Sequence, residues 1–116
     1  MPKLHPVVYG VAGEADAAGI FERTTHQWLW SDHLLITRIV AMCTARAAMV
    51  LRYGLQKASS VVWLGHIDLD AAGYPTDDTP LVLVPAEHAV YLYGSGFTAA
   101  DKIQVWIYGL LTTPET

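Results

Sequence analysis

The sequence has few charged residues, and this shortage is its clearest general property. Asp, Glu, Lys and Arg make up 16% of the 116 residues, whereas hydrophobic residues make up 53%; soluble domains usually carry about 25% charged residues. A domain of this size has a large surface for its volume, so part of the apolar material must remain outside the core. Exposed apolar area of this kind usually marks contacts between proteins. We therefore expect an oligomer, or a subunit of a larger assembly, rather than a free monomer.

Basic residues are scarce as well, which argues against a nucleic-acid partner. The seven Lys and Arg residues are scattered and the net charge is −4, whereas a surface that binds phosphates needs clustered basic residues. The long apolar stretch 34–51 contains Arg38 and Arg46, which makes it a poor membrane span, and no apolar run near the N-terminus is typical of a signal peptide. Cys43 is the sole cysteine, so no internal disulfide can form, as suits synthesis in a reducing cytoplasm.

Sequence motifs for catalysis are missing too. Ser95 lies between two glycines in YGSGF, but the pattern is not G-x-S-x-G, and such a serine is usually part of a turn. Cys43 lies in an apolar run without an identifiable basic partner, so we expect a buried, inert thiol. The five histidines show no spacing typical of a zinc site, and no glycine-rich loop is followed by a lysine. We expect no catalytic residue, no cofactor and no enzyme activity.

One cluster, His66-x-Asp68-x-Asp70, could present an imidazole and two carboxylates to a metal from one face of a strand. The segment that starts at Asp68 also resembles a calcium loop. That template fails at Ala72 in its fifth position and at Thr79, where a bidentate glutamate is needed. We interpret the cluster as the polar face of a strand that runs into a solvated turn, and metal binding remains the alternative.

From residue 34 onward the sequence is typical of short strands separated by turns. Apolar or alternating segments are broken by turn residues such as those in AAGYPTDDTP and SGFTAAD. This pattern predicts an all-β domain over 34–116, an antiparallel β-sandwich or barrel. The segment 40–52 is alanine-rich and could form a helix. Its β-branched first half favours strand, so we predict two strands joined by a tight turn near 44–46.

The first 33 residues differ from the rest of the chain. VVYGV predicts a short strand, but the glycines and alanines of 12–19 are typical of a loop. We therefore predict an extended N-terminal arm over 1–33 that lies on this domain or on a neighbouring subunit. Trp28 and Trp30 would anchor it, because tryptophan buries a large area at low entropic cost. If these residues form such an arm, we expect that removing residues 1–30 leaves a folded domain.

The last alternating segment, DKIQVWIYGLL, has two apolar faces. Ile103, Val105 and Ile107 would point to the core, and Trp106 and Tyr108 would point away from it. Tyr and Trp are enriched in interfaces, so this second face indicates either a contact with another surface or cover by the arm. Sequential strands are often neighbours, so the tyrosines of HAVYLYG could extend the same aromatic surface, which a saccharide could also use. The candidate interface residues are Trp28, Trp30, Tyr91, Tyr93, Trp106 and Tyr108.

The order of these segments resembles that of small β-sandwich, jelly-roll-like structural proteins of tailed bacteriophages. About two-thirds of the chain carries the resemblance, in LLITRIVAMCTARAAMVLRYG, SSVVWLGHIDLDAAGYPTDD, TPLVLVPAEHAVYLYGSG and DKIQVWIYGLL. The resemblance implies a virion protein, best fitted by a head decoration (cement) protein. Such a protein would sit on the capsid surface as a trimer and bind the major capsid protein by non-covalent contacts. A neck, tail or head-fibre component and a carbohydrate- or receptor-binding module are the alternatives, whereas a cupin-like metalloenzyme lacks its histidine-rich motif.

Overall fold

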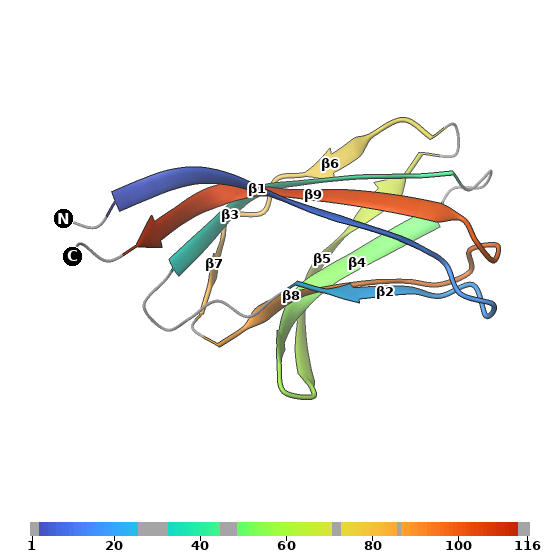
Figure 1. The fold of residues 1–116 in the computed structure, drawn as a ribbon, viewed down its shortest axis with the longest axis horizontal. Coiled ribbons are helices and arrows are strands. Elements are labelled where there is room, and N and C mark those ends of the chain that lie inside the picture. The colour runs from blue at the N-terminus through green and yellow to red at the C-terminus, as the bar shows by residue number, and fades with distance from the viewer. Residues whose placement is uncertain (1–2, 26–32, 45–48, 71–72, 86, 114–116) are drawn as a thin grey trace.

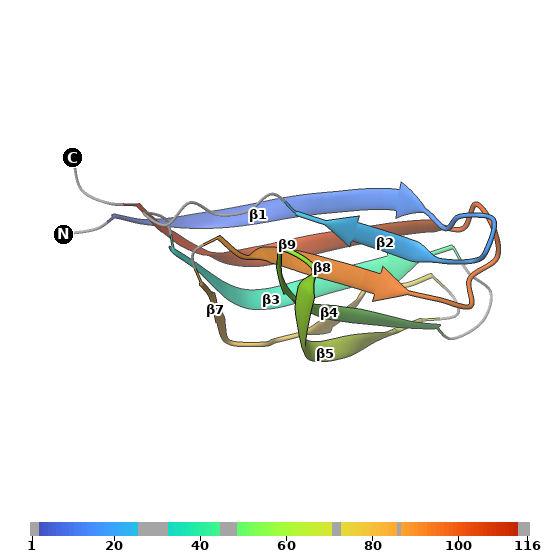
Figure 2. The same cartoon turned by 90° about the horizontal axis from the view of Figure 1, so that it is seen from below.

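A computed structural model describes residues 3–25, 33–44, 49–70, 73–85 and 87–113 of the chain. These residues form two antiparallel sheets that pack face to face (Figures 1 and 2), with strand orders β1-β9-β3-β6 and β2-β8-β4-β5. The short strand β7 also pairs with β3. The strands in the described residues are β1 (Lys3–Glu14), β2 (Phe21–Thr24), β3 (His33–Cys43), β4 (Met49–Lys57), β5 (Ser60–Leu69), β6 (Thr76–Asp78), β7 (Val82–Val84), β8 (Ala89–Gly94) and β9 (Lys102–Thr113).

The strands pair from the two ends of the chain inward. β1 pairs with β9, β2 with β8, β3 with both β6 and β7, and β4 with β5. The chain is therefore one long hairpin wound across two sheets, which is the order of a jelly roll, with β6 and β7 sharing one strand position. This confirms the predicted all-β, jelly-roll-like antiparallel sandwich. Within the described ranges the structure has no helix that is long and apolar enough to cross a membrane.

The core lies between the two sheets and is built from alternating strand positions. Ile103, Val105 and Ile107 of β9 are completely buried, and Val90 and Leu92 of β8 are 1% and 0% exposed from the opposite sheet. Successive side chains of a strand point to opposite faces, so this alternation leaves the intervening residues on the outside. The inward face predicted for β9 is confirmed, and Val90 and Leu92 show the same alternation in β8.

Within the segment 40–52, residues 40–43 and 49–52 lie in strands rather than in a helix. β3 ends at Cys43 and β4 begins at Met49, and most of the predicted turn falls in residues 45–48, outside the described residues. Ile39 and Val40 are buried and lie opposite β9. Branched side chains pack well on a pleated sheet, and long-range pairing with β9 outweighs the helix propensity of the alanines.

The described part of residues 1–33 does not form an arm outside the sandwich, which corrects that prediction. β1 pairs with β9 from the Lys3–Thr113 pair to the Glu14–Lys102 pair, and the two strands lie side by side in Figure 2. Three side chains of β1 pack against the core: Val7, Tyr9 and Val11. The small residues Ala12 and Gly13, predicted as the start of a loop, instead extend the predicted strand VVYGV, because they pair with Gln104 and Ile103 of the long β9. Both strands from this segment are sheet members.

The turn between β1 and β2 is joined to the turn between β8 and β9. Gly19 has a φ of 77°, and a Cβ there would lie 2.2 Å from the carbonyl oxygen of Phe97, so only glycine fits. The amide of Phe97 donates to the carbonyl of Gly19 (3.1 Å), and the amide of Ala15 donates to the carbonyl of Asp101 (2.8 Å). These contacts bind the start of the chain to its last hairpin.

Deleting residues 1–14 is expected to prevent folding, contrary to the expectation for an arm. The deletion exposes the backbone of β9 along one edge and uncovers part of the core, so the product should lose cooperative thermal unfolding and the β signal in circular dichroism. The substitution Val8→Thr is the control, because Val8 is 53% exposed on the same strand. A deletion product with a native-like melting transition would show that β1 is dispensable.

A hydrogen bond between the sheets supplies a second test of the fold. Tyr53 on β4 is 2% exposed, and its hydroxyl donates to the carboxylate of Asp78 on β6 of the other sheet. Burial and this bond both raise the pKa of Tyr53 above its usual value. Tyr53→Phe removes the donor, so urea denaturation should show a loss of about 1.5–3 kcal/mol in unfolding free energy, the range for bonds to charged groups. Tyr74→Phe, at a residue that is 69% exposed, should change it little.

Candidate interaction surfaces

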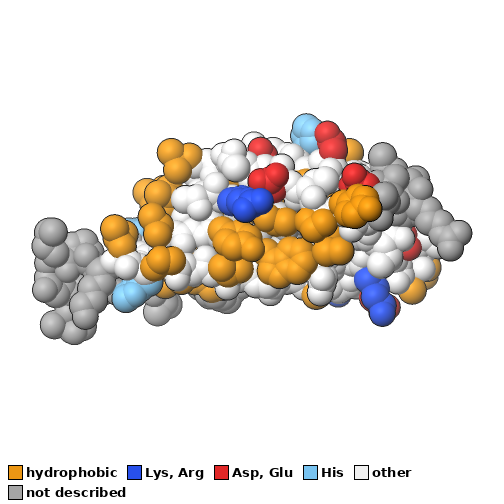
Figure 3. All heavy atoms as spheres, turned by 90° about the horizontal axis from the view of Figure 1, so that it is seen from above, with side chains coloured by type: hydrophobic (Ala, Val, Ile, Leu, Met, Phe, Trp, Pro, Cys, Tyr) orange, Lys and Arg blue, Asp and Glu red, His pale blue; other side chains and the backbone are white. Residues whose placement is uncertain are grey.

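The outer face of the sheet formed by β1, β9, β3 and β7 is predominantly hydrophobic, and we call it the apolar face. Figure 3 shows hydrophobic side chains gathered across this side of the molecule, with few charged ones among them. Leu4, Val8, Leu83 and Tyr108 are 63%, 53%, 59% and 36% exposed. The outward residues of the apolar face are Leu4, Val8, Leu35, Leu83, Trp106, Tyr108 and Leu110.

Cross-strand register brings these side chains together. Tyr108 on β9 lies opposite Val8 on β1 and Arg38 on β3, so an aliphatic and an aromatic side chain adjoin across the sheet. The guanidinium of Arg38 lies 5.8 Å from the Tyr108 ring centroid, and its Nε lies 2.9 Å from Asp77 Oδ2. This arginine is therefore already paired with a carboxylate, and the face keeps its apolar character.

Trp106 and Tyr108 lie on the outer side of β9, as its alternation predicts, with Tyr108 exposed and Trp106 half-buried. Their role in an interface remains a prediction. Trp28 and Trp30, the predicted anchors of the arm, lie outside the described residues. The structure thus places one predicted pair of interface residues on the apolar face.

The single surface envisaged for Tyr91, Tyr93, Trp106 and Tyr108 does not exist. β8 and β9 belong to different sheets, and the outward side chains of the two strands point to opposite sides of the sandwich. The prediction assumed that sequential strands are neighbours, but in a jelly roll the chain crosses between the sheets at this turn. The aromatic residues therefore divide into two separate surfaces.

The second surface is an aromatic cluster on the outer face of the sheet β2-β8-β4-β5. Its members are Arg52, Trp63, Tyr91 and Tyr93. The Trp63 ring centroid lies 5.5 Å from that of Tyr91 and 6.4 Å from that of Tyr93, and the Arg52 guanidinium carbon lies 4.1 Å from the Trp63 ring centroid. These separations are within the range of favourable aromatic and cation–π contacts.

Gly54 and a β-bulge explain why this cluster forms. Gly54 lies between Tyr91 and Trp63 in the sheet register, so no side chain separates the two rings. A bulge at 53–54 shifts the register of β5. Simple alternation placed Trp63 on the same face as Ile67, but Ile67 is 2% exposed and Trp63 is 38% exposed. The cluster role of Trp63 was missed, since period-two reasoning does not anticipate a bulge.

Tyr91 is further held by β2, where its hydroxyl donates to the Glu22 carboxylate. Desolvation by burial, followed by this bond, raises the pKa of Tyr91 to about 12. The protonated phenol is therefore the form that the fold stabilises. Since the folded pKa exceeds the unfolded value near 10, this stabilisation is complete below pH 10 and is lost as the pH rises towards 12.

A spectrophotometric titration tests this linkage. The absorbance of tyrosinate near 295 nm should include a component that titrates near pH 12 in the native protein and is missing in Tyr91→Phe. The unfolding free energy of the native sequence should fall between pH 10 and pH 12, and that of the Tyr91→Phe variant should fall less steeply over the same interval. Identical slopes in the two proteins would contradict the assignment.

The predicted metal candidates are only partly brought together. His66 Nε2 lies 3.7 Å from Asp68 Oδ1, and their side chains are 61% and 80% exposed on β5. Asp70 follows the end of that strand. Within the described ranges no three His, Cys, Asp or Glu side chains are grouped as a metal site would require.

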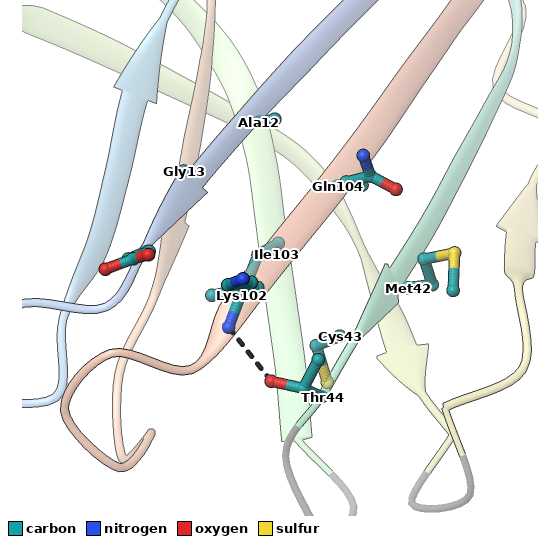
Figure 4. A pocket seen from close by; sticks show the side chains of 9 residues that line it. Ala12, Gly13, Met42, Cys43, Thr44, Lys102, Ile103 and Gln104 are labelled. Carbon is teal, nitrogen blue, oxygen red and sulfur yellow. Dashed lines mark hydrogen bonds between the residues drawn. The ribbon is translucent and has the colours of Figure 1, made fainter.

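A shallow hollow of about 460 Å³ lies at one end of the apolar face, where β1, β9 and β3 run side by side (Figure 4). Its lining includes Ala12, Met42 and Gln104, and the amide of Lys102 donates to Thr44 Oγ1 at 3.0 Å. The adjoining Cys43 is buried, as expected for an inert thiol. The lining also includes Glu14 and Lys102, so this hollow is more polar than the apolar face beside it.

These features define an antiparallel β-sandwich of jelly-roll order with two chemically different outer faces. No family model matches the chain, and no curated protein matches it. Among solved structures, the chain is similar to the extra small virus (XSV) VLP of the giant freshwater prawn Macrobrachium rosenbergii. The TM-score is 0.41 at 7% identity, and the match covers 97% of this chain and 81% of that chain. No functional conclusion follows from a likeness at this level.

Proposed function

We propose that the protein is a virion structural protein that acts through its apolar face, as a head decoration (cement) protein. It would sit on the capsid surface as a trimer and bind the major capsid protein without covalent chemistry. The observation that carries the proposal is the row of exposed hydrophobic side chains across β1, β9, β3 and β7. Contiguous exposed apolar area on a folded domain usually marks a protein contact.

The energetics of the apolar face fit repeated association. Complete burial of a large apolar side chain contributes about 1.5–3 kcal/mol, and the partly exposed Leu4, Val8 and Leu83 each retain a substantial share of that gain for a partner. The ordering of side chains and the loss of translational and rotational freedom on association offset much of this free energy in a single contact. On a lattice, several linked contacts multiply weak individual affinities, so a modest patch on each subunit is sufficient.

The jelly-roll order is compatible with this function without specifying it. Viral capsid domains, lectins and cupins all have this architecture, so the fold is compatible with several classes of protein function and does not select one of them. A neck, tail or head-fibre position would use the same apolar face and differs only in location within the particle. The proposal assigns no catalytic step to any residue.

A carbohydrate- or receptor-binding module is the second candidate function. It is favoured by the aromatic cluster on the other sheet, where the ring centroids of Trp63, Tyr91 and Tyr93 lie within 6.4 Å of one another. This surface is distinct from the apolar face, so the two functions are separable by mutation.

Combined substitution of Trp106 and Tyr108 by alanine tests the first function. We expect association to weaken by at least about tenfold, equivalent to about 1.4 kcal/mol, because both side chains lie on the outer side of β9. Self-association is measured by sedimentation velocity, and capsid binding by co-sedimentation with shells of the major capsid protein from the same particle.

Val62→Thr is the control, since Val62 is 63% exposed on β5 of the other sheet. Its association should match that of the unaltered protein. A large fall in melting temperature with association intact would assign Trp106 and Tyr108 to folding instead. A native protein that neither self-associates nor binds shells would contradict the proposed function.

A further inference from the structure

A second hollow, of about 530 Å³, lies beside the aromatic cluster on the face opposite to the apolar face. Its lining consists of Val50, Arg52, Trp63, Leu64, Gly65 and His66. In the sheet register Arg52 lies between Tyr93 on β8 and His66 on β5. The hollow therefore combines an arginine, an indole and an imidazole with the aliphatic side chains of Val50 and Leu64.

Arg52 is held in place by stacking and keeps its charge available. Its guanidinium carbon lies 4.1 Å from the Trp63 ring centroid, which orients the planar group. The residue is exposed, and among the described residues no carboxylate forms an ion pair with it. A guanidinium fixed on a ring leaves N–H groups for an anion and loses little side-chain entropy on binding.

Arg38 on the opposite face provides an internal comparison. It also stacks on an aromatic ring, at 5.8 Å from the Tyr108 centroid, but its Nε already contacts Asp77 Oδ2 at 2.9 Å. The two arginines thus share exposure and stacking, and they differ in whether a carboxylate of the chain occupies the guanidinium. For Arg52, a carboxylate that pairs with the guanidinium would have to be supplied by a ligand.

The rings beside Arg52 indicate what carries that carboxylate. Trp63 lines the hollow and remains 38% exposed. Tyr91 and Tyr93 lie beside it, with the three ring planes inclined to one another by 32° to 64°. The C–H face of a pyranose packs on aromatic rings, while its substituents accept or donate hydrogen bonds at the edge. A sugar lying against the Trp63 ring would place a ring carboxylate near the guanidinium, and the exposed His66 could contact its hydroxyl groups.

We propose that the hollow around Arg52 and Trp63 binds an acidic saccharide, with Arg52 pairing with a uronate or sialate carboxylate and Trp63 supporting the sugar ring. This inference rests on the second candidate function, carbohydrate binding, and names the class of saccharide and the residue that selects it; it does not depend on the apolar face. Saccharide binding and subunit association can therefore fail independently.

Isothermal titration calorimetry of the full chain at low ionic strength tests the site with trigalacturonate, which is compared first with the neutral trisaccharide maltotriose and with inorganic phosphate. Trigalacturonate should bind at least about tenfold more tightly than either of the others, since a charge-assisted bond to arginine and ring contact act together. Arg52→Gln should reduce its affinity by at least about tenfold, and Arg52→Lys should restore only part of it, because lysine lacks the planar fork.

The matched control is Arg38→Gln, which should leave trigalacturonate binding unchanged. Thermal melting of each variant confirms that the fold is retained. If maltotriose bound as tightly as trigalacturonate, the carboxylate would have no role in recognition. If phosphate bound as tightly, the hollow would be a general anion site that does not recognise the sugar. Equal affinity for a pentaglutamate peptide would assign the hollow to an acidic polypeptide instead. An absence of trigalacturonate binding, or binding that Arg52→Gln leaves intact, would overturn the proposal.

Discussion

The pairing of β1 with β9 joins the two ends of the chain, and the other features of the structure depend on it. β9 is flanked by β1 on one side and β3 on the other, so its inward residues are fully buried and its outward residues lie in the middle of a sheet face. Without β1, one edge of β9 would have unpaired backbone groups, which favour pairing with other chains. Closing this edge also positions Val8 beside Tyr108 and so widens the apolar face.

The sandwich presents two outer faces with different chemistry. The apolar face combines aliphatic side chains with Trp106 and Tyr108, and its arginine is neutralised by Asp77. The opposite face carries the cluster around Trp63, where Arg52 lacks such a partner among the described residues. A protein bound to a shell through one face would leave the other directed outward. Structural association and ligand recognition are thus compatible within one small domain.

Several elements could be predicted from the sequence because their signals are local. The alternation of β9 predicted both of its faces, the β-branched residues of β3 favoured strand, and the turn residues separated the later strands. The errors share one cause, which is dependence on a distant partner. Ala12 and Gly13 are typical of a loop until β9 lies beside them, and Trp63 changes face because of a bulge opposite Gly54. Tyr91, Tyr93, Trp106 and Tyr108 were identified as surface candidates, but their division between two sheets was not predicted.

By itself, the sequence determined the all-β class, the buried face of β9 and the excess of apolar surface, because alternation and composition act residue by residue. Only the tertiary structure decided which strands became neighbours. That choice placed Tyr91 and Trp106 on opposite faces, made β1 a sheet member, and brought Arg52 against Trp63. The physical reason is that strand pairing satisfies backbone groups far apart in the chain, so the surfaces it creates are set by register and sheet order rather than by any local pattern.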